Sequence, residues 1–316
     1  MRRILLDTDL AMGTPGSDID DGFALALALA DPELTVELVT TVNGNTDVET
    51  ATRLTLQLLD RLGRADIPVV RGAASSLRGW RHESPSGQAG PSEVARQPEP
   101  GYAAVHLVER VMSEPGSLTI VAIGPLTNVA LALAIEPALA ERVQQIVVMG
   151  GVFLEHTNRA SMPGEFNTWA DPDAAALVLR SGAPLRYVGL DVTLQVRLTR
   201  GDAEAMAESG SDFGRFAGQC AREWIDHLGR TFPGEQLESG SCALHDPLAV
   251  AAVTRPDLVT WRPAFVQVET SSPLTRGVMV ADLLAAHQPH AANCEIATGV
   301  DGKGFIDLFL DRISSL

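Results

Sequence analysis

The stretch that decides the fold is Arg3-Ile-Leu-Leu-Asp-Thr-Asp9, followed after ten residues by Asp20-Asp-Gly-Phe-Ala-Leu-Ala-Leu-Ala-Leu-Ala30. A short apolar run that ends in acidic residues is typical of a strand whose carboxyl end lies at the ligand-binding edge of a parallel sheet. Leucine and alanine alternate over Phe23–Ala30, but both are good helix formers and poor strand formers, and Ser17 and Asp18 offer a helix cap. These features predict a strand over Arg3–Leu6 and then a helix that is buried on most sides.

The same alternation continues along the chain. Further strands are predicted at Val36–Val42, Ile67–Val70, Leu118–Ile123, Val143–Met149, Leu185–Val188, Phe265–Glu269, Gly277–Val280 and Glu295–Ala297. Helices are predicted at Thr46–Leu62, Thr199–Glu208, Asp212–Leu228 and His245–Val253, with a closing helix near Ile306–Ile313. This rhythm predicts an α/β fold: one domain over residues 1–316, with a mostly parallel, Rossmann-like central sheet flanked by helices.

Composition and charge restrict the class of function. The 316 residues include 24 Lys and Arg against 40 Asp and Glu, a formal net charge of −16, which argues against nucleic acid or an anionic membrane as a partner. No apolar run approaches the roughly 18 residues that cross a bilayer, and Asp7 follows the N-terminal arginines too soon for a signal peptide. We therefore expect a cytoplasmic protein that binds a metal cation or a small molecule.

Two further features concern loops and thiols. The 29 residues of Gly72–Pro100 are rich in Gly, Pro and Ser and have no apolar period, which predicts either an active-site lid or a floppy insertion. Cys220, Cys242 and Cys294 lie far apart without a paired spacing, so neither a disulfide framework nor a zinc site is indicated. We interpret them as ordinary thiols.

Aspartates are concentrated after the first predicted strand. Asp7, Asp9, Asp18, Asp20 and Asp21 fall within fifteen residues, and they repel one another unless a cation lies among them or some stay protonated. Helix capping accounts for one or two of them, but not for Asp7 and Asp9 on the strand. Oxygen donors without His or Cys favour Ca²⁺ or Mg²⁺ over zinc, so the cluster predicts a metal site.

Two other clusters that carry candidate residues follow later predicted strands. A strand end runs into a helix at Val121–Asn128, with Thr127 or Asn128 as its cap. Glu165 and Asn167 lie two residues apart and would point the same way on an extended segment, as a pair that grips a diol requires.

Two aspartates precede prolines. Asp171, before Pro172, is interpreted as a helix cap and left out of the site. Asp246 has the same form before Pro247, and beside it His245 alone would be a core histidine. Their combination with the aspartate cluster favours a functional role instead.

These motifs in their order resemble the calcium-dependent nucleoside hydrolases, the inosine–uridine-preferring N-ribohydrolase family. The resemblance covers nearly the whole chain. It rests on DTD at Asp7–Asp9, IDD at Ile19–Asp21, TTVNGN at Thr40–Asn45, GPLTN at Gly124–Asn128, VVMGG at Val147–Gly151, EFN at Glu165–Asn167 followed by DPDAA, GLDVT at Gly189–Thr193, HDP at His245–Pro247 and TRG at Thr275–Gly277. Each motif alone is weak, whereas their order and spacing together are highly specific.

The resemblance implies hydrolysis of the N-glycosidic bond of ribonucleosides to free base and ribose, by a Ca²⁺-bound water that an aspartate activates. The implied metal ligands are Asp9, which also takes the proton from the attacking water, Asp21, Asp246 and the backbone carbonyl of Ile123. The implied ribose contacts are Asp20, Asn45, Glu165 and Asn167, with Met149 packing on the sugar. His245 would lie near the nucleobase and supply the leaving base with a proton or hydrogen bond. Asp7 would be a supporting acid, and a homodimer or homotetramer is implied.

The chain departs from the family pattern in two places. Ten residues, Leu10 to Ile19, separate Asp9 from Asp20, and we expect this insert to loop out; Asp18 in it has no assigned role. His82 takes the place of a family loop residue over the base and is a candidate base contact. Trp224 and His227, one helical turn apart, are weaker candidates, because such residues more often belong to the core or the surface.

Two alternatives stay open from the sequence. A haloacid-dehalogenase-like phosphatase would use Asp7 as nucleophile, but it needs a downstream lysine, and the sole lysine is Lys303, near the C-terminus. A non-catalytic nucleoside- or sugar-binding protein would normally be exported and would not need an aspartate beside a metal-bound water. We therefore predict the ribohydrolase, while its preferred base stays open.

Overall fold

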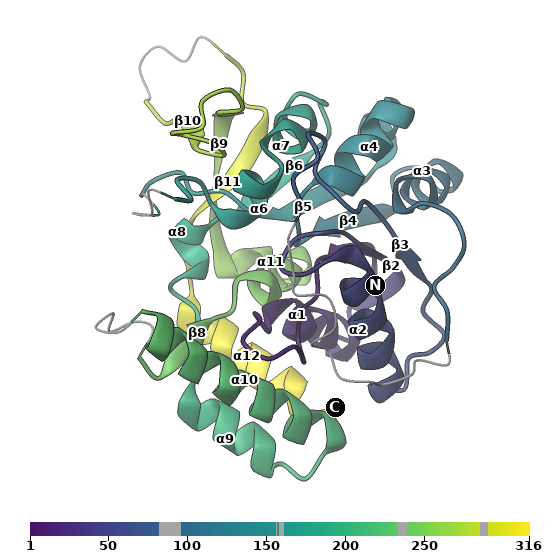
Figure 1. Ribbon diagram of the computed structural model, residues 1–316. Helices are drawn as coiled ribbons and strands as arrows, with labels where there is room; N and C mark the ends of the chain where they lie inside the picture. Colours follow the sequence, from purple (N-terminus) through teal and green to yellow (C-terminus); the bar gives the residue numbers. More distant parts are fainter. Residues whose placement is uncertain (82–95, 156, 158–160, 233–238, 285–289) are drawn as a thin grey trace.

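The predicted strands assemble into one nine-stranded sheet in the computed structural model, with the order β10-β9-β11-β6-β5-β4-β1-β2-β3 (Figure 1). The structure describes residues 1–81, 96–155, 157, 161–232, 239–284 and 290–316. The strands of this sheet are β1 (Arg2–Thr8), β2 (Leu34–Thr41), β3 (Val69–Arg71), β4 (Leu118–Ala122), β5 (Gln145–Met149), β6 (Leu185–Val188), β9 (Val259–Val268), β10 (Met279–Asp282) and β11 (Cys294–Val300). Pairing is parallel from β3 to β11, and only β9 and β10 add antiparallel strands at one edge. The prediction of a mostly parallel sheet is confirmed.

Helices cover both faces of this sheet. They are α1 (Asp20–Ala30), α2 (Val48–Arg61), α3 (Ala103–Ser113), α4 (Thr127–Ile135), α5 (Leu139–Arg142), α6 (Phe166–Ala170), α7 (Pro172–Leu179), α8 (Leu190–Thr193), α9 (Arg200–Glu208), α10 (Asp212–Thr231), α11 (His245–Thr254) and α12 (Gly302–Ile313). A separate small ribbon pairs β7 (Arg197–Thr199) with β8 (Ser241–Ala243). Within the described ranges, no helix is long and apolar enough to cross a membrane.

The core is divided by the sheet into two apolar layers. Ile4 and Leu6 of β1 face α1, α2, α10, α11 and α12, whereas Leu5 faces α3, α4 and α7. Figure 1 shows these two sets of helices on opposite sides of the strands. Because successive side chains of a strand point to opposite faces, a continuous apolar run such as Ile4–Leu6 is buried only when both faces are covered.

The caps of two helices, α1 and α4, differ from the prediction. Ile19, rather than Ser17 or Asp18, occupies the N-cap position of α1, and Asp18 Oδ1 accepts the N–H of Ile19 at 2.7 Å. Neither Thr127 nor Asn128 caps α4, whose N-cap is Leu126. Both side chains instead donate hydrogen bonds to buried aspartates, because an unpaired carboxylate in the interior costs more than an uncapped helix end.

The expectation that the insert Leu10–Ile19 loops out is wrong for its first residues. Leu10, Ala11 and Met12 are buried in the core, because they are apolar and Gly22 makes room for Met12: a Cβ on Gly22 would lie 2.2 Å from Met12 Sδ. The more exposed part then passes α10, where Gly16 lies against the ring of His227.

Candidate active site

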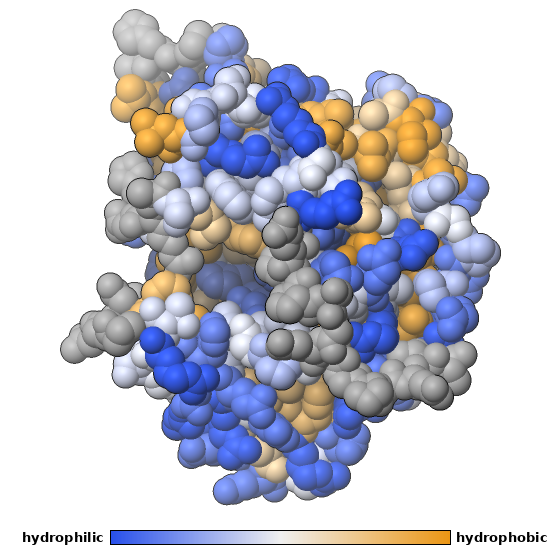
Figure 2. Space-filling view, viewed as in Figure 1, coloured by the Kyte–Doolittle hydropathy of each residue, from blue (hydrophilic) through white to orange (hydrophobic). Residues whose placement is uncertain are grey.

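The carboxyl ends of four parallel strands bring the predicted residues to one edge of the sheet. Asp9 follows β1, Ile123 follows β4, Met149 ends β5, and the loop after β2 leads to Asn45. Asp20 and Asp21 begin α1, Asp246 lies in the first turn of α11, and Glu165 and Asn167 lie at the start of α6. This is the edge where open parallel sheets bind ligands. The face shown in Figure 2 is hollowed beside α8 and α11.

Three aspartates form the tightest acidic group. Asp20, Asp21 and Asp246 each place one carboxylate oxygen within 4.8 Å of the others, and all three side chains are buried. Asp9 joins them through its backbone N–H, which donates to Asp21 Oδ1 at 3.2 Å, and the N–H of Asp246 donates to Asp20 Oδ2 at 3.2 Å. The amino ends of α1 and α11 both meet these acids, where partial positive charge favours carboxylates.

Asn45 links two of these acids. Its backbone N–H donates to Asp9 Oδ2 at 2.7 Å, and its side-chain Nδ2 donates to Asp21 Oδ2 at 3.0 Å. Two glycines make this packing possible: a Cβ on Gly44 would lie 2.0 Å from Asp9 Oδ2, and one on Gly124 would lie 2.8 Å from Asp9 Oδ1. The sequence reasoning did not single out these glycines, although their place at the strand ends was a signal for close backbone approach.

Burial raises the pKa values of the clustered acids. The pKa of Asp9, Asp20 and Asp246 lies well above the usual range, first because of desolvation and then because of neighbouring carboxylates. Burial raises the pKa of Asp21 to about 6, although hydrogen bonds from Thr8 and Asn45 oppose the shift. Such a group favours either protons or a cation.

The donor set fits a hard divalent cation. It consists of oxygen atoms, which Ca²⁺ and Mg²⁺ prefer. Asp9 Oδ1 is buried and has no hydrogen-bond partner among the described residues, so it is an acceptor that a ligand could satisfy.

Glu165 and Asn167 are brought together by a helix start and not by the extended segment that we expected. Glu165 is the N-cap of α6: Oε1 accepts the N–H of Asn167 at 2.7 Å, and Oε2 accepts from Gly151 and Thr168. The reason is that the first N–H groups of a helix need acceptors. Asn167 Nδ2 donates to the carbonyl of Ile123 at 2.8 Å and to that of Met149 at 3.3 Å.

Asp7 and Asp171 lie beside the cluster with structural partners. Asp7 Oδ1 accepts from Asn128 at 2.8 Å and from Thr40 at 2.5 Å, and burial raises the pKa of Asp7 to about 7. Asp171 caps α7, as predicted, by accepting the N–H of Ala174 at 3.1 Å. Lys303 binds Asp307 on the surface of α12. Because the sole lysine, Lys303, lies on α12 and binds Asp307, Asp7 lacks the lysine that the phosphatase alternative requires.

His245 lies next to Asp246 at the start of α11. Its Nδ1 is 2.7 Å from the hydroxyl of Thr193, and burial, together with the charge of Arg197, lowers the pKa of His245 to about 4. The imidazole is therefore neutral near pH 7. Trp224 and His227 stack on each other, with ring centroids 5.3 Å apart, and Trp224 packs against the core.

The segment predicted as a lid is described only at its two ends. Trp80, at the first end, packs edge-on against Phe166 and Trp169 of α6, and the N–H of Leu77 donates to Asp171 Oδ2 at 2.8 Å. His82 lies outside the described residues. The choice between lid and insertion stays a prediction.

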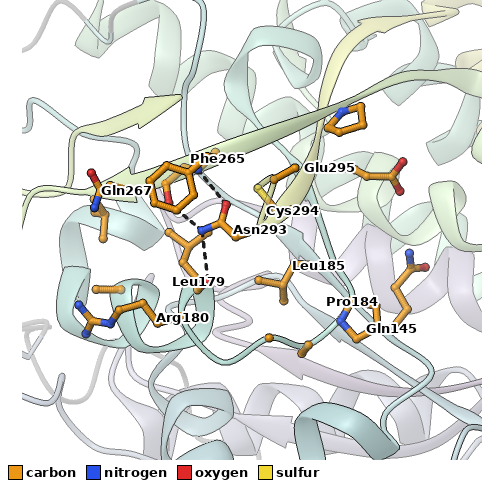
Figure 3. A pocket seen from close by; sticks show the side chains of 17 residues that line it. Gln145, Leu179, Arg180, Pro184, Leu185, Phe265, Gln267, Asn293, Cys294 and Glu295 are labelled. Carbon is orange, nitrogen blue, oxygen red and sulfur yellow. Dashed lines mark hydrogen bonds between the residues drawn. The ribbon is translucent and has the colours of Figure 1, made fainter. Parts of the chain in front are cut away.

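A cavity of about 730 Å³ lies elsewhere (Figure 3). Gln145 and Leu185, among its lining residues, are the first residues of β5 and β6, so it opens at the amino ends of these strands. None of the predicted site residues lines it. The candidate active site is therefore defined by its side-chain chemistry, at the opposite ends of the strands.

Known proteins resemble this chain over nearly its full length. The family model described as inosine-uridine preferring nucleoside hydrolase matches residues 4–307. The non-specific ribonucleoside hydrolase RihC of Escherichia coli is 38% identical over 311 residues, covering 96% of this chain and 95% of RihC. The pyrimidine-specific ribonucleoside hydrolase RihA of Citrobacter koseri is 34% identical over 324 residues, covering 98% of this chain and 97% of RihA. The solved structure of a purine-preferring ribonucleoside hydrolase from Gardnerella vaginalis has a TM-score of 0.88 at 31% identity, and the match covers 99% of this chain and 98% of that enzyme's chain.

Proposed function

The chain belongs to the inosine–uridine preferring nucleoside hydrolase family and is a hydrolase acting on ribonucleosides, and we propose that Asp9 is the base that activates the attacking water. The observation that carries this proposal is Oδ1 of Asp9, which is buried beside Asp21 and has no hydrogen-bond partner in the described part of the chain, while Oδ2 is fixed by the N–H of Asn45. One oxygen is thus held in place while the other is available for a proton. The family excludes both alternatives, the phosphatase and the non-catalytic binding protein.

We propose Ca²⁺ as the cation of this site, held by Asp9, Asp21, Asp246 and the carbonyl of Ile123. When bound, Ca²⁺ would lower the pKa of a water molecule and offer positions for sugar hydroxyls. Its charge would also offset the repulsion that raises the pKa values of these carboxylates.

The ribose is proposed to lie among Asp20, Asn45, Glu165 and Asn167, with Met149 against the sugar ring. Glu165 Oε2 already accepts three hydrogen bonds, whereas Oε1 accepts the N–H of Asn167, which leaves Oε1 for a ribose hydroxyl. As the glycosidic bond breaks, the sugar gains oxocarbenium character. Nearby carboxylates stabilise that positive charge.

The leaving base is proposed to meet His245. When the hydroxyl of Thr193 donates to Nδ1, the proton of the neutral ring is on Nε2 and can form a hydrogen bond to a base nitrogen. A neutral imidazole is suited to this donation near pH 7, because it needs no protonation beforehand. The homo-oligomer and the cytoplasmic location stay predictions.

A turnover panel tests the proposed function. Purine and pyrimidine ribonucleosides, with 5′-nucleotides as comparison substrates, are incubated with the protein, and free base, ribose and phosphate are measured. We expect base and ribose in equal amounts, loss of turnover with a calcium chelator, and recovery with excess Ca²⁺. Turnover that resists the chelator would contradict the calcium site, and phosphate release alone would contradict the reaction.

The pH dependence of stability tests the acidic cluster without substrate. In the folded protein the pKa of Asp7 is about 7 and that of Asp21 about 6, above their usual value of 3.8. Between pH 3.8 and about pH 7 the folded state therefore binds more protons than the unfolded chain. The free energy of unfolding consequently falls as the pH rises through this range. For chelator-treated protein we expect the Tm to fall from about pH 5 to about pH 8. Added Ca²⁺ should raise the Tm more at the higher pH, and an equal rise at both would argue against binding by these acids.

A further inference from the structure

The TRG motif lies far from the proposed ribose contacts in the sequence but touches the helix that carries two of them. Arg276 is half-buried in the loop between β9 and β10. Its Nε donates to the carbonyl of Trp169 at 2.7 Å, and its Nη2 donates to that of Ala170 at 3.0 Å. Its guanidinium also lies 5.8 Å from the centre of the Trp169 ring. Both carbonyls belong to the last turn of α6.

A helix as short as α6 depends on partners at its ends. The last carbonyls of a helix have no N–H donors from a further turn of the same helix. In α6, which has five residues, Arg276 supplies donors for two of these carbonyls. At the other end, Glu165 accepts the N–H groups of Asn167 and Thr168. The backbone groups at the two ends of α6 are therefore satisfied by Glu165 and by Arg276.

The backbone of the same loop fixes the distance between Arg276 and α6. A Cβ on Gly277 would lie 2.5 Å from the Cα of Trp169, and one on Gly164 would lie 2.4 Å from the carbonyl group of Gly277. Gly277 also has a φ of +74°, which glycine adopts without strain. The loop is closed by hydrogen bonds of its own, Gly277 N–H to Glu269 O at 3.0 Å and Val278 N–H to Thr275 O at 3.0 Å. Arg276 thus reaches α6 from a preformed loop.

We propose that Arg276 is a positioning residue for sugar binding, which acts by holding α6 so that Asn167 and Glu165 keep their places. The inference rests on the proposed function, because it takes these two side chains as ribose contacts. Asn167 connects α6 to the carbonyls of Ile123 and Met149, so a displaced α6 changes the sugar side of the site directly. The acids on α1 and α11 have no hydrogen bond to Arg276 within the described residues, so the carbonyl of Ile123, which accepts from Asn167, is the one proposed cation ligand that a shift of α6 would reach.

The test compares Arg276→Ala with the wild-type protein by steady-state kinetics and by inhibition with free ribose. Small misplacements of binding groups have large kinetic effects, so we expect KM and the inhibition constant of ribose to rise by about tenfold or more. The Ca²⁺ affinity should fall much less than the affinity for ribose, because three of the four proposed ligands are the acids Asp9, Asp21 and Asp246, which lie outside α6. Arg276→Lys keeps the charge but loses the planar two-donor geometry, and should recover only part of the affinity.

The control is Arg64→Ala, which removes an arginine that makes two hydrogen bonds to Asp66 on the surface. It should leave KM unchanged. If Arg276→Ala does not fold, the KM and the ribose inhibition constant of Arg276→Lys test the inference instead. Wild-type KM and ribose inhibition in a folded Arg276 variant would overturn the inference. A wild-type protein that releases no base from ribonucleosides would instead overturn the proposed function.

Discussion

Asp9→Asn is expected to lower kcat for base release by about 10³-fold, because general-base catalysis of this kind contributes about 10² to 10⁴. Asparagine has the shape of aspartate, which matters here since Gly44 and Gly124 leave no spare room around the side chain. It can still accept the N–H of Asn45, but it cannot take a proton from water. The measurement is turnover at saturating Ca²⁺, with binding of the ion followed separately by calorimetry.

The control for Asp9→Asn is Asp31→Asn. Asp31 is also buried, at the C-cap of α1, and it accepts hydrogen bonds from Thr254 and the N–H of Glu33. Its loss should lower the Tm without lowering kcat. Full turnover of Asp9→Asn with its cation bound would show that another group accepts the proton.

Asp246→Asn is expected to weaken Ca²⁺ binding by about two orders of magnitude, because Ca²⁺ affinity follows the number of charged ligands. Turnover at micromolar Ca²⁺ should fall accordingly and recover in part at millimolar Ca²⁺. The same change should raise the Tm of the metal-free protein above neutral pH. The reason is that it removes one of the buried carboxylates that repel Asp20, Asp21 and Asp9.

Asp246→Asn is thus expected to lower the Ca²⁺ affinity but to raise the Tm of the metal-free protein, and this combination distinguishes a cation site from an acidic cluster that only supports the fold. If Asp246 served only the fold, its replacement would lower the Tm with and without Ca²⁺. Calcium titrations of Asp246→Asn and Asp31→Asn, followed by calorimetry and by thermal unfolding, make the comparison. An unchanged Ca²⁺ affinity in Asp246→Asn would remove Asp246 from the proposed ligand set.

The sequence predicted the sheet well because its signals are local. The run Ile4–Leu6 is apolar throughout, and this pattern is typical of a strand that is covered on both faces. Acidic residues follow the run where the chain leaves the sheet. The same argument placed the acids at one edge. The detailed roles of Ile123 and Met149 came from the family resemblance, because a backbone carbonyl and a methionine carry no distinctive pattern.

The errors concern contacts between distant segments. Thr127 has the side chain of a helix cap, but its local preference was overridden by a neighbour that only the fold supplies, Asp171, to which its hydroxyl donates. Met12 belongs to the insert that was expected to loop out, and it is buried because Gly22, ten positions later in the sequence, has no side chain to occupy the space that Met12 fills. Asn167 was assigned to an extended segment with Glu165 because a five-residue helix is too short to show a period, whereas only Glu165, the N-cap, has an extended backbone.

The close approach of Gly44 and Gly124 to Asp9 has a consequence for how base preference can diverge. Any side chain at either position would meet a carboxylate oxygen of Asp9 at 2.8 Å or less, so these positions offer no route for gradual change by substitution. The named relatives nevertheless include pyrimidine-specific, non-specific and purine-preferring enzymes. In this chain we therefore expect changes of base preference to come from positions with room to vary, such as the more exposed part of the insert beside His227, and not from Gly44 or Gly124.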